Sequence, residues 1–166
     1  MEEKLRKLML GMIAYNEGDA KRIQHFIKVH ALARLIGEEE QLAPDALYIL
    51  EAAALTHDIG IKNSEKKYGT CGGKQQELEG PPEAEKLLQS LGFDGSVISR
   101  VCWLIAHHHT YGNIDAADYQ ILVEADFLVN LYEDGVGLDA VKTAYSRIFK
   151  TETGKKLCRT MYGFTE

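Results

Sequence analysis

Apolar residues recur at intervals of three and four along most of this sequence, and this spacing constrains the fold more than any other feature. In an α-helix such residues line one face, which must be buried against a neighbouring element. No stretch of useful length alternates apolar and polar residues as a half-buried strand does. The sequence also shows no internal repeat and no linker, so we predict one all-α domain, a helical bundle, over residues 1–166.

Capping residues and turn formers divide this pattern into helices. Asp19 has the short polar side chain of an N-cap, and Pro44 suits the first turn of a helix. Pro81 and Pro82 are expected to open another helix for the same reason. The glycine-rich residues 60–80 are interpreted as a long loop, of a kind that is often functional. The expected helices cover about residues 2–15, 19–37, 44–57, 81–92, 94–109, 118–132 and 138–150, with a short one after residue 154.

Composition excludes several classes of protein. The net charge of -6 argues against broad binding to nucleic acid or to acidic lipid. No apolar run approaches the roughly 18 residues that a membrane span requires. The N-terminus lacks a signal-peptide pattern, and the three cysteines (Cys71, Cys102 and Cys158) are odd in number and widely spaced. We therefore expect a cytoplasmic protein without a disulfide framework.

His57 and Asp58 stand side by side where the third expected helix stops. The pair has two ordinary explanations, because a histidine is favoured at the negative end of a helix and an aspartate often forms a turn. A third explanation is a ligand pair. Adjacent helical residues point about 100° apart, so one metal ion off the helix end could reach both side chains.

Other candidate ligands lie on separate helices. Asp126 lies in the middle of an apolar helix, where a carboxylate is costly to bury unless it is paired or bound to metal, although a solvated stripe would also explain it. His25 lies in the second helix. His30 is five residues further on, which places it some 140° around the axis, so we expect it to have a structural role or to support a ligand.

Three consecutive histidines, His107, His108 and His109, follow the helix expected at 94–109. They cannot all point the same way, but one or two could face a cleft, and imidazolium at a helix end is the ordinary alternative. Imidazole together with carboxylate suits Mn, Fe, Co, Ni or Zn as a divalent cofactor. A site with four such ligands leaves positions open for water and substrate, which is typical of a catalytic centre.

The sequence resembles the HD-domain metal-dependent phosphohydrolases. The resemblance rests on five segments in the family's order and covers roughly residues 15–133, with residues 2–15 and 138–163 as additional helices. The segments are RIQHFIKV (22–29), AALTHDIG (53–60), EGPPEAEKLLQSLGF (79–93), LIAHHHTYG (104–112) and EADFL (124–128).

This resemblance implies a set of metal ligands and a second group of residues near the substrate. It also implies that His107 or His108 faces the active site, binding a second metal or the substrate phosphate. Some dinuclear members carry a lysine where this chain has Ile61, and a further histidine where residues 59–106 have none, which favours one metal or a weak second one. The implied metal ligands are His25, His57, Asp58 and Asp126.

The hypothesis from sequence is hydrolysis of a phosphate ester, in a small nucleotide or related metabolite, by metal-activated water. Asp58 would ligate the metal and orient or deprotonate the water, while the loop at 61–80 closes over the substrate. Cationic donors would stabilise the phosphoryl oxygens. The candidates for that role are Arg22, Lys62, Lys66, Lys67 and protonated His107 or His108.

Two alternatives stay open at this stage. One is a non-catalytic module that binds a metal or a nucleotide, and the other is an oxidative di-iron protein on the same fold. The partner expected for the hydrolase is a small phosphorylated molecule. Oligomeric state is left open, because the helix at 2–15 could cap the bundle or pair with a partner.

Overall fold

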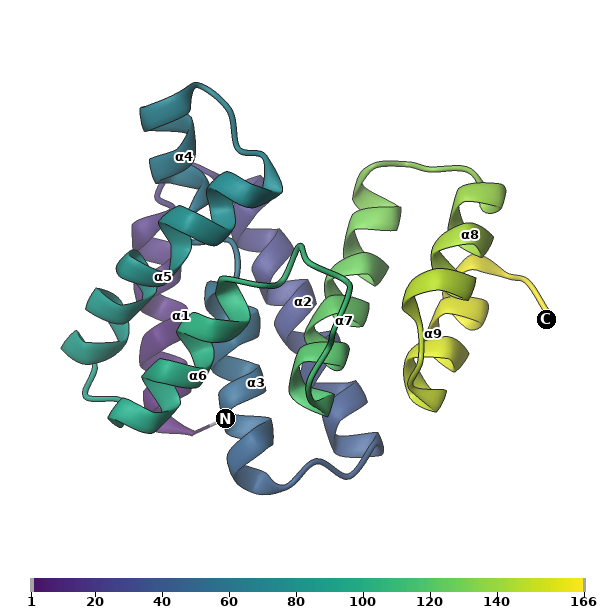
Figure 1. The fold of residues 1–166 in the computed structure, drawn as a ribbon, viewed down its shortest axis with the longest axis horizontal. Coiled ribbons are helices and arrows are strands. Elements are labelled where there is room, and N and C mark those ends of the chain that lie inside the picture. Colours follow the sequence, from purple (N-terminus) through teal and green to yellow (C-terminus); the bar gives the residue numbers. More distant parts are fainter. Residues whose placement is uncertain (1, 166) are drawn as a thin grey trace.

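The computed structural model describes residues 2–165, and within that range it contains nine α-helices and no strand (Figure 1). The all-α prediction is therefore confirmed. In chain order the helices are α1 (Glu3–Tyr15), α2 (Ala20–Glu39), α3 (Pro44–Thr56), α4 (Ile61–Tyr68), α5 (Gly73–Ser90), α6 (Gly95–Ile105), α7 (Ala117–Glu133), α8 (Leu138–Ile148) and α9 (Glu152–Tyr162).

Helix α3 is the centre of the bundle. It packs against α1, α2, α6 and α7, so it has neighbours on several sides. Its last two turns are buried all round, and three of the residues there are alanines, Ala52, Ala53 and Ala54. Small side chains let the surrounding helices approach closely. The end of α3 therefore carries His57 and Asp58 into the interior of the protein rather than to its surface.

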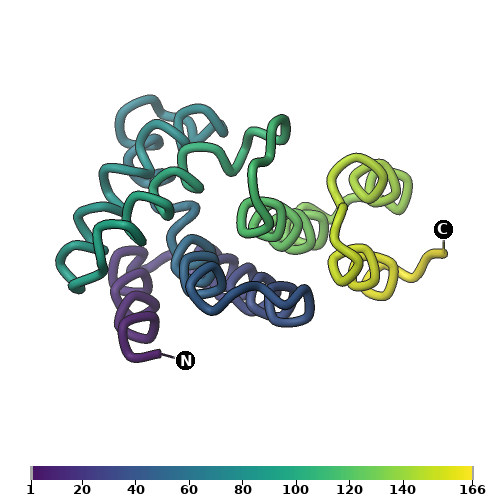
Figure 2. Tube along the Cα trace, turned by 60° about the horizontal axis from the view of Figure 1, so that its bottom comes forward, coloured from purple at the N-terminus to yellow at the C-terminus, as the bar shows by residue number. Residues whose placement is uncertain are grey.

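The remaining helices flank this centre on two sides. Helices α1, α4 and α5 lie on one side, and the pair α8 and α9 lies on the other side of α7 (Figure 2). The fully buried Glu124 of α7 ties this pair down, because its carboxylate accepts hydrogen bonds from the backbone N–H groups of Lys150 (2.6 Å) and Thr151 (2.9 Å).

The long loop expected at residues 60–80 is not present. Residues 61–68 form α4, and α5 begins at Gly73, eight residues before the Pro81–Pro82 pair that was expected to open it. The glycines here serve close packing rather than flexibility. A Cβ on Gly60 would lie 2.6 Å from the backbone nitrogen of Gly80, and one on Gly80 would lie 2.5 Å from a methyl carbon of Ile105.

Helix α6 also differs from its expected length. It ends at Ile105, and residues 106–109 form turns, so the three histidines lie in a turned segment and do not continue the helix.

Asp19 is the N-cap of α2, as predicted, and its carboxylate accepts a hydrogen bond from the backbone N–H of Arg22 at 3.0 Å. Of the helices at residues 2–165, none is long and apolar enough to cross a lipid bilayer.

Candidate metal centre

Four of the predicted ligands meet in the interior of the bundle. His25 comes from the middle of α2, His57 and Asp58 from the end of α3, and Asp126 from the middle of α7. The Nε2 atoms of His25 and His57 lie 3.2 Å apart. Asp58 Oδ2 lies 3.3 and 3.4 Å from these two nitrogens, and Asp126 Oδ1 lies 3.2 and 3.5 Å from them. Helices far apart in the sequence therefore bring two imidazoles and two carboxylates to one point.

The hydrogen bonds of the two Nδ1 atoms define which nitrogen of each imidazole carries the hydrogen. His57 Nδ1 lies 2.9 Å from the carbonyl oxygen of Ala54, and His25 Nδ1 lies 2.8 Å from Glu133 Oε2. Both partners only accept, so each Nδ1 carries the hydrogen and donates it. In the neutral rings both Nε2 atoms then hold lone pairs. Two lone pairs that face each other at 3.2 Å repel unless a cation lies between them.

The spacing of His25, His57 and Asp58 fits a first-row divalent metal, since ligand atoms of these three residues all lie within 4.8 Å of one another. With metal–ligand bonds of about 2.1 Å, neighbouring ligand atoms lie about 3.0 Å apart in an octahedral site and about 3.4 Å apart in a tetrahedral one. The measured separations of 3.2 to 3.5 Å fall at that scale. The chemistry of the donors and their spacing thus agree that His25, His57 and Asp58 could hold a metal ion, and the Asp126 carboxylate contacts both imidazoles of this group.

Protons take the place of the cation when no metal is bound. Burial disfavours imidazolium at His57, but the carboxylates of Asp58 and Asp126 outweigh it and raise the pKa of His57 to about 9. The pKa of His25 is raised as well, because hydrogen bonding and charge from the same carboxylates exceed the cost of its burial. The pKa values of the two acids are lowered despite their burial. The facing imidazolium groups lower the pKa of Asp58 to about 2 and that of Asp126 still further.

A second cluster shares Asp58. His108 is 1% exposed, and its Nδ1 donates to the carbonyl oxygen of Ile105 at 2.7 Å. Its Nε2 is buried without a hydrogen-bond partner and lies 3.7 Å from Asp58 Oδ1. Ligand atoms of Asp58, His108 and His109 lie within 4.8 Å of one another. A buried nitrogen without a partner costs free energy, and a second cation beside Asp58 would relieve that cost.

His109 is held as a neutral ring within this second cluster. Gln76 Nε2 donates to the carbonyl oxygen of Cys71 at 2.6 Å, which turns the Gln76 oxygen towards His109 Nε2 at 2.9 Å. His109 therefore donates from Nε2 and keeps the lone pair on Nδ1. Burial, helped by the charge of His108, lowers the pKa of His109 to about 4. A neutral imidazole is the form that binds metal.

A pocket of about 230 Å³ opens onto the first cluster. His25 and Asp58 form part of its wall, and the Asp58 side chain is 18% exposed while that of His57 is fully buried. Lys21 and Arg22 also line the pocket, together with several acidic groups. Those acids would repel an anionic ligand, and a bound cation would offset this repulsion. The acidic residues of the wall are Asp19, Asp58, Glu133 and Asp134.

The structure brings only some of the expected cationic donors to the site. Arg22 lies in the pocket wall, where its guanidinium contacts Glu65 at 2.6 Å. Lys62 turns away and donates to the carbonyl oxygen of Tyr15 at 2.9 Å. His107 stacks on Trp103 at 4.1 Å between ring centroids and lies outside both clusters. His108 and His109, rather than His107, therefore face Asp58.

Sequence reasoning did not identify Glu133 and assigned no role to His109. Glu133 lies seven residues after Asp126, two helical turns further on the same face of α7, and that spacing was the available signal. His30 has the structural role that its position suggested, since its Nε2 lies 3.0 Å from Glu51 Oε1 in a separate buried pair.

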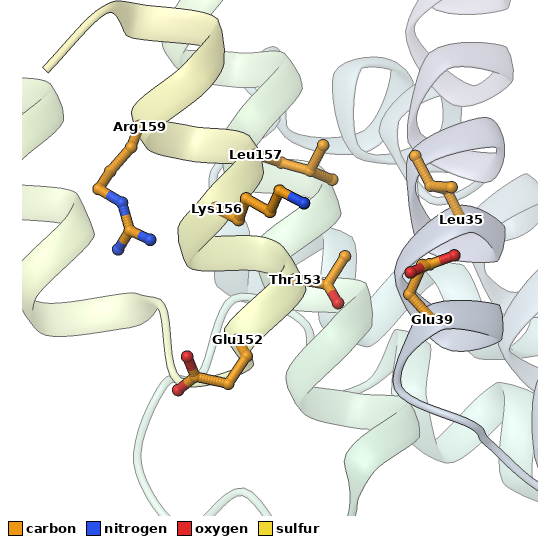
Figure 3. Close-up of a pocket in the computed structure, with 7 residues that line it drawn as sticks. All are labelled: Leu35, Glu39, Glu152, Thr153, Lys156, Leu157 and Arg159. Carbon is orange, nitrogen blue, oxygen red and sulfur yellow. The ribbon is translucent and has the colours of Figure 1, made fainter. Parts of the chain in front are cut away.

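Another hollow, of about 390 Å³, lies between the end of α2 and helix α9 (Figure 3). Leu35 and Glu39 of α2 face Thr153, Lys156 and Leu157 of α9, while Arg159 points away from α2 (Figure 3). No histidine or cysteine is among its lining residues.

The fold and this site define a helical bundle with a cluster of His and Asp side chains that could hold a metal ion, and the comparisons with known proteins agree. The chain matches the HD domain family over residues 22–145, and it belongs to that family. The crystal structure of a predicted HD superfamily hydrolase from an uncultured Thermotogales bacterium superposes with a TM-score of 0.69 and 28% identity, covering 96% of this chain and 86% of that one. No curated protein matches the sequence.

Proposed function

We propose that this protein is a metal-dependent phosphohydrolase that acts on a phosphate ester, in a small nucleotide or a related phosphorylated metabolite. The observation that carries the proposal is the pair of Nε2 lone pairs of His25 and His57, 3.2 Å apart and flanked by two carboxylates. The similar structure described as a predicted HD superfamily hydrolase supports hydrolysis as the reaction.

The role of each ligand follows from its contacts. His25, His57, Asp58 and Asp126 would hold a divalent ion such as Mn, Fe, Co, Ni or Zn. When bound, that ion would polarise a phosphoryl oxygen and lower the pKa of a bound water. Asp58 is the ligand with the most exposed side chain, so it can reach the substrate pocket. A carboxylate that ligates a metal ion is a weak base, which favours orienting a water molecule over removing its proton.

The pocket supplies the cationic contacts that a phosphate needs. Arg22 and Lys21 line it on the side of α2, and guanidinium binds phosphate oxygens through paired hydrogen bonds. Because Glu65 and Asp19 already contact Arg22, the guanidinium is held in place before the substrate enters. Asp58 Oδ1 faces His108, so a second cation there would lie next to the same phosphate.

The first experiment is elemental analysis of the purified protein beside a His57→Ala, Asp58→Ala double variant whose folding is checked by circular dichroism. We expect at least one equivalent of transition metal per chain, which the double variant loses. His107→Asn is the matched control, because His107 lies outside both clusters, and it should keep the metal. Absence of metal after reconstitution with Mn, Fe, Co, Ni and Zn would contradict the proposal.

The second experiment is a screen of phosphate esters with the metal-loaded protein. Release of inorganic phosphate by the parent protein, and not by the double variant, supports hydrolysis. A protein that binds metal and retains a nucleotide intact over hours would instead be the non-catalytic module.

A further inference from the structure

A groove of about 570 Å³ lies between α7 and α8, and it shares no lining residue with the pocket at Asp58. Its volume falls within the range of about 300 to 1,000 Å³ that is typical of small-molecule sites. Most of its lining is apolar or aromatic, so we call it the apolar groove. The apolar and aromatic residues that line it are Tyr111, Phe127, Leu131, Ala140, Ala144 and Ile148.

The apolar groove is elongated, because it follows one face of α8. Ala140, Ala144 and Ile148 are spaced by four residues, so they lie on the same side of this helix. From Ala140 to Ile148 the helix rises by about 12 Å. Phe127 and Leu131, also four residues apart, line the groove from α7. A groove of this length suits an extended chain better than a compact ring system.

Small side chains on α8 keep the groove open. Ala140 and Ala144 each carry only a methyl group, so α8 leaves space beside the aromatic rings. The rings of Tyr111 and Phe127 lie edge to face with centroids 5.1 Å apart, and Tyr111 is 44% exposed. An aliphatic chain packed against these walls removes apolar surface from water on both sides, which is the main driving force for binding such a chain.

A single cation stands at one end of the groove. Arg147 adjoins Ile148, whose carbonyl oxygen accepts a hydrogen bond from Gln120 Nε2 at 2.9 Å, so this end of α8 lies beside the first part of α7. Arg147 is exposed, and it makes no ion pair and no hydrogen bond with any other residue in the described range 2–165.

The charge of Arg147 is not compensated by the groove itself. None of the lining residues in the part of the chain that the structure describes is acidic. Guanidinium binds a carboxylate through two parallel hydrogen bonds. The apolar groove therefore combines a long apolar surface with one positive charge at its end, which is complementary to an amphiphile that has an anionic head.

We propose that the apolar groove binds a free medium-chain fatty acid, with its alkyl chain along α8 beside Phe127 and its carboxylate on Arg147. A neutral apolar molecule would leave the guanidinium unpaired, and a small anion would leave the apolar walls exposed to water. The site is independent of the proposed hydrolysis, because the groove and the pocket at Asp58 have separate linings. A bound chain contacts α7 and α8 together and so holds α8 against the bundle.

The test is an NMR titration of the full-length protein with decanoate, octanoate and 1-octanol. Decanoate should bind at one site and shift the methyl signals of Leu131, Ala140 and Ala144, which line the groove. Octanoate has two fewer methylene groups to bury, so it should bind about tenfold more weakly than decanoate. 1-Octanol has the same chain length as octanoate without its charge, and it should bind more weakly than octanoate.

Arg147→Met separates the head group from the chain. This variant should weaken decanoate binding about tenfold, because the charge-assisted hydrogen bonds are lost, and it should leave the affinity for 1-octanol unchanged. Lys142→Met is the matched control. Lys142 is another exposed cation of α8, but it lines a different hollow together with Phe164, so its removal should keep the parent affinity for decanoate.

Ala140→Phe fills the groove, and it should abolish the binding of both decanoate and 1-octanol. Absence of saturable decanoate binding to the parent protein would overturn the proposal, as would equal losses in Arg147→Met and Lys142→Met. A parent protein that is dimeric in ultracentrifugation, becomes monomeric on Ala140→Phe and does not bind decanoate would show that a second copy covers the groove. Sedimentation with anionic lipid vesicles without binding of free decanoate would overturn the proposal in favour of a membrane surface.

Discussion

Glu133 holds His25 from the side opposite the metal cluster: its Oε2 lies 2.8 Å from His25 Nδ1, and its Oε1 lies 2.7 Å from Lys28 Nζ. The contact joins α7 to α2 and orients the imidazole so that Nε2 points at His57 and Asp126. A carboxylate behind a histidine ligand fixes the tautomer and raises the basicity of the ligand nitrogen.

Replacing Glu133 with glutamine should therefore weaken metal binding without unfolding the protein. The amide can still accept from Nδ1–H, but it no longer supplies a negative charge. We expect the dissociation constant for Mn²⁺ or Co²⁺ to rise about 10- to 100-fold, measured by competition with a chromogenic chelator.

Glu51→Gln is the control for this change. Glu51 pairs with His30 at 3.0 Å in a buried contact of the same chemistry, outside both metal clusters. This variant should lose stability and keep the parent affinity for metal. If both variants bind metal as tightly as the parent protein, Glu133 has no part in the site.

The composition of the first cluster could be predicted through the family resemblance, because each candidate ligand taken alone also has an ordinary structural explanation. A carboxylate such as Asp126 inside an apolar helix needs a partner, and the resemblance to the HD family implied that this partner is a metal ion. The direction of His107, His108 and His109 could not be predicted. It depends on α6 ending at Ile105, and a boundary of this kind varies by several residues in any reading of a sequence.

The helix assignments failed where glycine was taken as a sign of flexibility. Gly60 and Gly80 lie against each other with no room for a Cβ, so their purpose is close approach of α5 to the end of α3. Such packing is a tertiary property, and a single sequence carries no signal that separates it from a loop. The same approach places Gln76 beside His109, which is why the second cluster was not foreseen in full.

His108→Ala tests whether the second cluster binds its own metal. The variant removes the buried Nε2 that lies 3.7 Å from Asp58 Oδ1, and it leaves His25, His57 and Asp126 unchanged. We expect the metal content after reconstitution to fall from two equivalents to one, measured by elemental analysis. Two equivalents in the variant, or only one in the parent protein, would show that the cluster at His108 holds no separate ion.

Glu124 should be required to attach α8 and α9 to the bundle. Its buried carboxylate accepts from two backbone N–H groups and from the Thr151 hydroxyl, so Glu124→Ala leaves those donors without partners. We expect a loss of about 3 kcal/mol in the free energy of unfolding. That loss lowers Tm by about 6 to 12 °C in calorimetry. Glu152→Gln, at an 89% exposed side chain on α9, should change the stability by less than about 0.5 kcal/mol.

Metal affinity should increase with pH because protons and metal compete for the same nitrogens. In the metal-free protein the facing carboxylates raise the pKa of His57 from 6.5 to about 9, so at pH 7 the ring is mainly protonated and a metal must displace that proton. Asp58 and Asp126 have lowered pKa values and stay ionised throughout this range. The dissociation constant should therefore fall about tenfold per pH unit for each proton displaced, and level off above about pH 9.

The raised pKa of His57 makes the stability of the metal-free fold decrease with pH, whereas metal affinity increases with pH. A histidine whose pKa is raised on folding stabilises the fold fully below the unfolded value of 6.5, and this contribution is lost as pH rises through about 9. The Tm of the metal-free protein should consequently fall between pH 6.5 and 9, and saturating metal should restore it. Calorimetry on the metal-free and metal-saturated forms across this range checks the prediction. A Tm of the metal-free protein that does not fall between pH 6.5 and 9 would contradict it, and a metal affinity that does not vary over the same range would contradict the preceding prediction.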